Sequence, residues 1–294
     1  MISLLSLFSF LTTGGNIVPW THLLVILADI SFTGFATLFF VVERNALKPV
    51  LPLDLLFRLP TRNIIISGFL SSLINYTTAR LNTPEMASTR LIIPSITFTV
   101  SSALTGSLIA HYKTPLPALR LGQLLLVTGT LALVLMAALL SLSNISSPWP
   151  YNIVLAIPTT GVGMMAPSVV LTLLNMVDST EHAVANRSLI MMRSLGVFVA
   201  TALGSSTLQN IFRGHFTSYH YGEKTRNRML DKNVQLIHRL EGPLKSQVVA
   251  AYGYAFTAVF GLCAIAATVL VVSLAQVKIK GFEERESGEK RVRG

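Results

Sequence analysis

The sequence predicts an all-α integral membrane protein, on the evidence of its composition and of the lengths of its apolar segments. Of the 294 residues, 51% are hydrophobic and 12% are charged, and the mean hydropathy is +0.61. These values lie far outside the usual range of soluble domains. The apolar residues gather in runs of about 16 to 26, and roughly 20 helical residues cross a hydrocarbon core about 30 Å thick. We therefore expect a set of membrane-spanning helices.

Seven complete apolar runs and one short N-terminal segment account for the predicted helices. The short segment is 1–13; no Lys or Arg precedes Arg44, so it lacks the positive n-region of a signal peptide and is interpreted as the end of a helix. Six of the complete runs are long enough to span, whereas 63–79 has about 17 residues, near the lower limit. The runs are 22–42, 63–79, 90–111, 119–142, 151–176, 188–211 and 249–275.

Lys and Arg in the short loops predict the orientation of these runs. The segment 43–62 holds four of them and is predicted to be cytosolic. Alternation then places 112–118, 177–187 and the basic tail 276–294 in the cytosol as well. It places 212–248 on the opposite side, against the seven Lys and Arg of that loop.

Several function classes have no support in the residues. The net charge of +10 is spread over loops on both sides of the membrane, so the basic residues are expected to meet anionic lipid rather than nucleic acid. Cys263 is the single cysteine, which excludes a disulfide or a cysteine-based metal site within one chain. No P-loop, HExxH or GxSxG motif occurs. We expect no enzyme, no metal and no bound cofactor.

Small residues at every fourth position predict close packing between helices. Such a spacing puts a smooth stripe on one helix face, where two backbones can approach. The stripes include Gly196, Ala200 and Gly204, and also Ser102, Gly106 and Ala110.

The run 151–176 is expected to be interrupted. It contains Pro158 and Pro167, with Gly161 and Gly163 between them. Broken helices at membrane depth often border the binding sites of carriers. A kink without a function is the alternative interpretation.

Arg193 is the charged residue that the run 188–211 must accommodate. It lies about 8 Å along the helix from Ser188, so its side chain could extend to the cytosolic interface and stay hydrated. The alternative is that it faces the bundle interior and forms a cytosolic gate with Asp178 or Glu181, since a guanidinium at this depth is better tolerated when paired.

Four segments carry a resemblance to a known family: GGNIVPW, RNALKPVLPLDLLFR, PTTGVGMMAP and above all MMRSLGVFVATALGSSTLQN. Together they resemble the fourteen-helix drug:proton antiporter branch of the major facilitator superfamily, with the fungal multidrug and vacuolar basic amino acid transporters as the most similar members. The resemblance extends through almost the whole chain.

The resemblance implies a division of the chain. Residues 1–42 would be one to two linker helices, 43–62 a cytosolic loop, 63–275 the C-terminal six-helix bundle of a major facilitator fold, and 276–294 a cytosolic tail. The N-terminal bundle of the family has no counterpart before Met1, and the family's ninth helix is cut short after Asn75 and Tyr76. Candidate substrate or gate residues are therefore Arg193, Asn75, Tyr76, Pro158, Gly161 and Gly163.

The implied function is proton-coupled transport of small cationic or amphipathic solutes, either drugs or basic amino acids, in a plasma or vacuolar membrane. Because one wall of the cavity is expected to be missing, the chain is interpreted as a truncated or half-length member, and a partner half-transporter or a homodimer would be needed for activity. An inactive membrane fragment is one alternative. A heptahelical receptor is another, disfavoured because the chain has one cysteine and no Asn-Pro motif in its last run.

Overall fold

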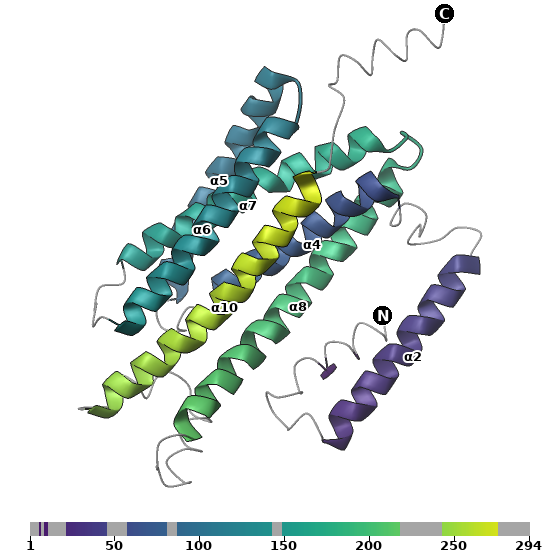
Figure 1. Cartoon of the computed structure of the whole chain (residues 1–294). Coiled ribbons are helices and arrows are strands. Elements are labelled where there is room, and N and C mark those ends of the chain that lie inside the picture. The colour runs from purple at the N-terminus through teal and green to yellow at the C-terminus, as the bar shows by residue number, and fades with distance from the viewer. Residues whose placement is uncertain are drawn as a thin grey trace, which may run out of the picture.

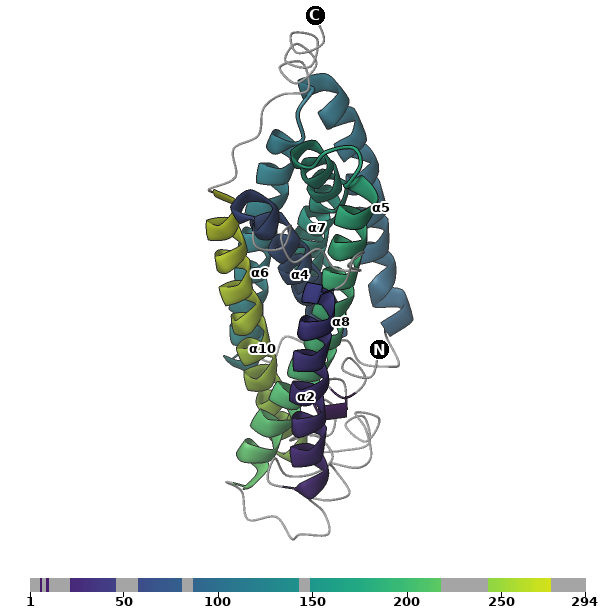
Figure 2. The same ribbon diagram turned by 90° about the vertical axis from the view of Figure 1, so that its right-hand side faces the viewer.

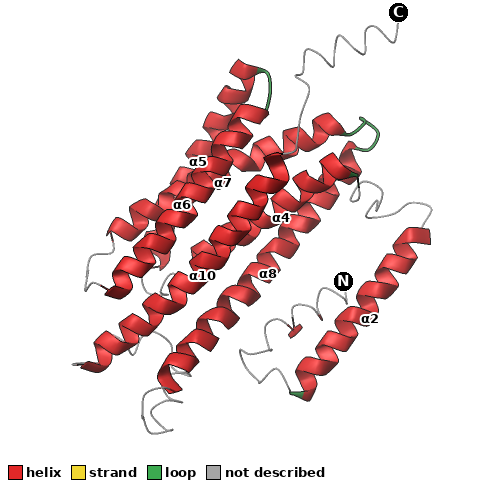
Figure 3. Cartoon of the chain, in the orientation of Figure 1, coloured by secondary structure: helices red, strands yellow, loops and turns green. Residues whose placement is uncertain are grey.

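The computed structural model describes residues 22–45, 58–80, 87–142, 149–217 and 243–275, together with residues 6, 9 and 10. This described part is helical, without a strand (Figures 1 and 3). Each of the seven apolar runs lies in one helix, so the predicted all-α class is confirmed. The helices are α2 (Leu23–Asn45), α4 (Leu59–Arg80), α5 (Ala87–Tyr112), α6 (Leu116–Leu142), α7 (Trp149–Met176), α8 (His182–Thr217) and α10 (Pro243–Ala275).

Five of the described helices are long and apolar enough to cross a membrane, namely α5, α6, α7, α8 and α10. A sixth, α2, has a shorter described apolar stretch, Leu23–Leu38. The 17-residue apolar run expected to be marginal lies in α4, which is 22 residues long but carries Arg62 and Arg80. The chain is thus a multi-pass membrane protein by the length and composition of its helices. The segments 1–5, 11–21 and 276–294, and most of the loop 43–62, lie outside the described residues.

Helix ends follow local rules of the backbone. Four helices carry proline at their first or second position, where the missing N–H has no intrahelical partner to lose: Pro60, Pro117, Pro150 and Pro243. Lys113 follows the last residue of α5 with a φ of 52°, the left-handed conformation that commonly ends a helix. The turn into α6 is therefore tight.

Six of the helices pack into one bundle (Figures 1 and 2). In this bundle α7 packs against α4, α5, α6 and α8, while α10 packs against α4, α6 and α8. The two most enclosed helices are α4 and α7. By contrast, α2 stands to one side in Figure 1 and packs closely along no described helix.

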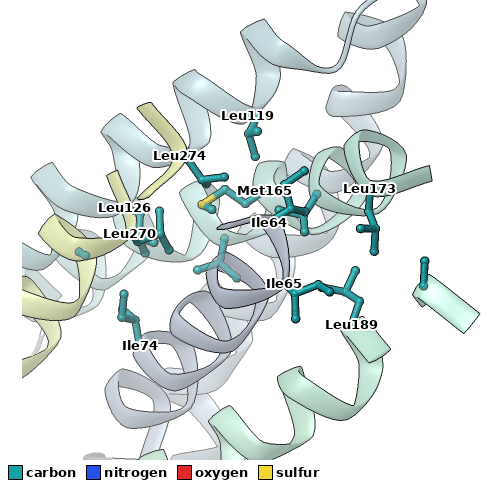
Figure 4. Close-up of a cluster of buried hydrophobic side chains, with 14 of the residues drawn as sticks. Ile64, Ile65, Ile74, Leu119, Leu126, Met165, Leu173, Leu189, Leu270 and Leu274 are labelled. Carbon is teal, nitrogen blue, oxygen red and sulfur yellow. The ribbon is translucent and has the colours of Figure 1, made fainter. Parts of the chain in front are cut away.

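The main core lies where α4, α6, α7, α8 and α10 meet (Figure 4). Ile64 of α4 lies near Met165 of α7, and Ile65 faces Leu189 of α8. All four side chains are at most 1% exposed. In a bilayer such contacts stabilise the fold mainly through close packing, since the lipid is as apolar as the side chains themselves.

The expectation that the run 151–176 is interrupted was wrong. The helix α7 is continuous from Trp149 to Met176, with Pro158 and Pro167 inside it. Each proline removes one backbone donor from the helix. Beside Pro158, the Thr159 hydroxyl shares its hydrogen bond between the carbonyls of Leu155 and Ala156, at 3.0 and 2.9 Å. Burial against neighbouring helices makes such prolines tolerable in a membrane helix.

Candidate functional site

Arg193 lies at the middle of the segment of α8 that is long and apolar enough to span a membrane. The helix α8 begins at His182, six residues before the apolar run suggested, and Arg193 is eleven residues from each end of the spanning segment His182–Gly204. That is about 16 Å of helix in either direction. The sequence-based distance of about 8 Å was counted from Ser188, whereas the helix itself begins at His182. An ionisable residue at this depth marks a functional site by default.

The guanidinium points across the bundle to α7. Its Nη2 donates a hydrogen bond of 3.0 Å to the carbonyl oxygen of Ala166, and the side chain as a whole is half-buried. The snorkelling interpretation requires the side chain to extend along α8 toward the membrane interface. In this structure it extends instead to the neighbouring helix.

Gly68 of α4 makes room for Leu189 of α8 and lies beside Arg193. A Cβ at Gly68 would lie 2.5 Å from Leu189 Cδ1 and 3.6 and 3.7 Å from Arg193 Cγ and Nε. A larger residue there would collide with α8. We call the junction of Gly68, Ala166 and Arg193, on α4, α7 and α8, the Arg193 site.

The acidic residues considered as partners of Arg193 are elsewhere. Asp178 and Glu181 lie exposed between α7 and α8, and within the described residues the hydrogen bond recorded for the Arg193 guanidinium is the one to Ala166. A gate that uses Arg193 stays a prediction, but the partner seen in the structure is a backbone carbonyl rather than a carboxylate.

Asn75 and Tyr76 are further along α4. Asn75 is half-buried and Tyr76 is 44% exposed. They lie seven and eight residues beyond Gly68, about 10 to 12 Å of helix. The structure therefore does not bring them to the Arg193 site, and their predicted role stays a prediction.

The three remaining candidates of α7 lie in close helix contacts. Pro158 packs on α6, where a Cβ at Gly129 would be 2.5 Å from its ring. A Cβ at Gly161 would meet two backbone atoms of α6 at 2.6 Å. Gly163 instead faces Phe98 and Ser101 of α5. These positions let backbones approach, which favours packing over the lining of a substrate path.

The stripe Gly196, Ala200, Gly204 lies along the α4–α8 contact. A Cβ at Gly196 would overlap the carbonyl oxygen of Phe69, and one at Gly204 would lie 3.7 Å from Thr77 Cγ2. Ala200, between them at the same spacing, is 1% exposed. This placement supports the packing role that the spacing predicts.

Sequence reasoning missed Gly68, Ala166 and a polar face of α4. Asn63, Ser67 and Ser71 recur every fourth residue and are all at most 7% exposed, which the spacing could have revealed. The serine hydroxyls donate to the carbonyls of Ile64 and Gly68 at 2.6 and 3.1 Å. Across the bundle, the hydroxyls of Thr97 and Thr159 join α5 to α7 at 3.0 Å. No cluster of potential metal ligands occurs in the part of the chain that the structure describes.

Comparison with known proteins finds a similarity to a transporter. No family model matches the chain. The chain is 24% identical over 252 residues to the vacuolar basic amino acid transporter 2 of Saccharomyces cerevisiae, a match that covers 80% of this chain and 52% of the transporter. The chain thus spans about half the length of this curated relative.

Proposed function

We propose that this chain is one half of a transmembrane transporter for small cationic or amphipathic solutes, basic amino acids or drugs among them. Three facts support the proposal. The chain is similar to part of a yeast vacuolar transporter, five of its described helices can span a membrane, and Arg193 lies at the middle of one of them. The last observation carries most weight for a transport role, since charged residues at that depth mark substrate or ion pathways.

In this proposal, a second helix bundle completes the carrier. The match covers 52% of the yeast transporter, and carriers built from repeated bundles bind their substrate between the repeats. The other wall of the cavity is supplied by further polypeptide or by a partner half-transporter, and a second copy of this chain is the alternative. The assembly acts as a carrier, not as an enzyme, in a plasma or vacuolar membrane.

The six packed helices offer no carboxylate for proton coupling. The sequences of α4, α5, α6, α7, α8 and α10 contain no Asp or Glu. A carboxylate that binds and releases the coupling proton must therefore belong to the other bundle, to a loop or to α2, which carries Asp29. In the proposed assembly, this chain contributes the Arg193 site and the packing that supports it.

The direct test is a chimera in which this chain replaces the matched half of the yeast transporter. Vesicles that contain the chimera and carry a pH gradient should accumulate radiolabelled lysine or arginine above the level of empty vesicles. Arg193→Gln should reduce the uptake at least about tenfold at equal expression if the charge is used in transport. A chimera that inserts normally and moves no solute would contradict the proposal.

The chain by itself serves as the second arm of this test. With one wall of the cavity absent, it should move neither basic amino acids nor cationic drugs under the same gradient. Uptake by the chain alone would overturn the requirement for a different second half and would favour a homodimeric carrier.

A further inference from the structure

The Arg193 guanidinium has more hydrogen-bond donors than the protein uses. A guanidinium carries five N–H groups, and the described structure records one hydrogen bond from it, to the Ala166 carbonyl. Arg193 contributes no atom to the set of buried side-chain atoms that lack a partner. Its remaining N–H groups are therefore accessible rather than sealed in the core, and they can bind a ligand.

The bundle provides no opposite charge for this group. The six packed helices contain no acidic residue. Asp178 and Glu181 lie between α7 and α8, with Glu181 twelve residues from Arg193, about 18 Å along the chain direction of the helix. Asp29 lies on α2, which does not pack closely on the bundle. A cation at mid-membrane depth without a counter-charge is costly, and an anionic ligand would offset that cost.

The neighbouring hydroxyls do not take the place of an anion. Ser67 and Ser71 of α4 donate to carbonyls of their own helix, as Ser188 and Ser194 of α8 do, to Val184 and Ile190 at 3.0 Å each. Gly68 brings α4 against this side chain: a Cβ there would lie in ordinary contact with Cγ and Nε of Arg193, at 3.6 and 3.7 Å. The planar fork of a guanidinium matches the two oxygens of a carboxylate, which it can bind with two parallel hydrogen bonds.

We propose that Arg193 binds the carboxylate of the transported solute, so that the solute is an amino acid rather than a cation without a carboxylate. This inference rests on the proposed transport function and narrows its substrate class. A purely cationic drug would meet a like charge at this site, with no acid on the six helices to offset the repulsion. A basic amino acid can place its carboxylate on Arg193 and its cationic side chain toward the second half of the carrier.

The test measures ligand-induced stabilisation of this chain, residues 1–294, in lipid nanodiscs. Cys263 is the single cysteine and is 1% exposed. A thiol-reactive dye therefore reports unfolding without an introduced cysteine. A ligand that binds the folded state raises the Tm according to its concentration and affinity. The probes are L-lysine, L-lysinamide, which lacks the carboxylate, and tetraphenylphosphonium.

Lysine should raise the Tm with a midpoint concentration about tenfold or more below that of lysinamide, because a hydrogen-bonded charge pair is lost in the amide. Arg193→Gln should remove this difference, and Arg193→Lys should keep only part of it, because a lysine ammonium lacks the fork. Arg187→Gln is the matched control: Arg187 is exposed on the same helix, and its loss should leave the preference unchanged.

Equal midpoints for lysine and lysinamide in the natural chain would overturn the inference and leave the transport proposal standing. This comparison needs no variant, so it holds even if Arg193→Gln fails to fold. A preference for lysine that survives in Arg193→Gln would also overturn it. If none of the three solutes raises the Tm, the inference fails, and uptake by the chimera then decides separately whether the transport proposal survives.

Discussion

Gly161→Ala should destabilise the bundle although the change adds a single methyl group. The new Cβ would lie 2.6 Å from the carbonyl oxygen of Gly122 and 2.6 Å from the amide nitrogen of Leu126. Both atoms belong to the backbone of α6, so no side chain can rotate away and the two helices must separate. Overpacking of this kind costs about 1–3 kcal/mol, and rigid backbone neighbours favour the upper end of that range.

The gain in helix propensity offsets part of this cost. Replacing glycine by alanine inside a helix contributes about 1 kcal/mol, which leaves a net loss of about 2 kcal/mol. For a chain of this size, that loss corresponds to a decrease in Tm of roughly 4–8 °C. The melting curve can be recorded with the thiol-reactive dye on Cys263.

Gly106→Ala on α5 is the matched control, because a Cβ there would meet nothing within 4 Å. It gains the same helix propensity without a collision, so its Tm should be unchanged or higher. If Gly161→Ala and Gly106→Ala melted at the same temperature, the close approach of α6 and α7 at Gly161 would not exist as described, and the reasoning would be refuted.

Three further predictions test other parts of the molecule. Arg193→Met should change the Tm by no more than about 4 °C. The variant loses a charged hydrogen bond of about 1.5–3 kcal/mol, but it also removes a charge that costs about 2.5–3.5 kcal/mol in the middle of a membrane. A much larger decrease in a thermal melt would make Arg193 a structural residue. Lys113→Gly should raise the Tm by about 2–4 °C, because glycine adopts the left-handed φ of 52° without the cost of about 1 kcal/mol that a side chain brings, and a lower Tm would contradict this. In a cysteine-free background, an impermeant thiol reagent should label Ser179→Cys from the cytosol only and Ser218→Cys from the opposite face only; labelling of both from one face would reject the alternation of the spans.

The positions of the helices could be predicted because lipid leaves few choices to an apolar segment. Backbone groups in the hydrocarbon must find partners within the segment, so a run of about 20 apolar residues becomes a helix. The ends were less accurate. The helix α8 starts at His182, in a polar stretch that hydropathy does not distinguish from a loop, so Arg193 was counted from Ser188 instead of from the start of its helix.

The partners of the site could not be predicted, because they depend on how the helices pack. Nothing in the spacing along the chain relates Arg193 to Ala166, which is 27 residues away, or to Gly68 on a third helix. Pro158 was misleading for the same reason: proline breaks an isolated helix, but α7 is enclosed by neighbours that hold it continuous. The stripe from Gly196 to Gly204 was informative, because it lies along the α4–α8 contact. The same spacing in Ser102, Gly106 and Ala110 was misleading, since Gly106 and Ala110 are exposed and a Cβ at Gly106 would meet nothing within 4 Å.

The enclosure of α7 has a consequence for how the membrane acts on the protein. Among its described residues, Ile153 is the one large apolar side chain that is substantially exposed, whereas α5, α6 and α10 each present several. A bilayer that is thinner or thicker than the protein acts on the side chains that touch acyl chains, by tilting the helices that carry them. Hydrophobic mismatch therefore reaches α7 only through its neighbours, and lipid thickness should alter the tilt of the outer helices well before it alters the contact between Ala166 and Arg193.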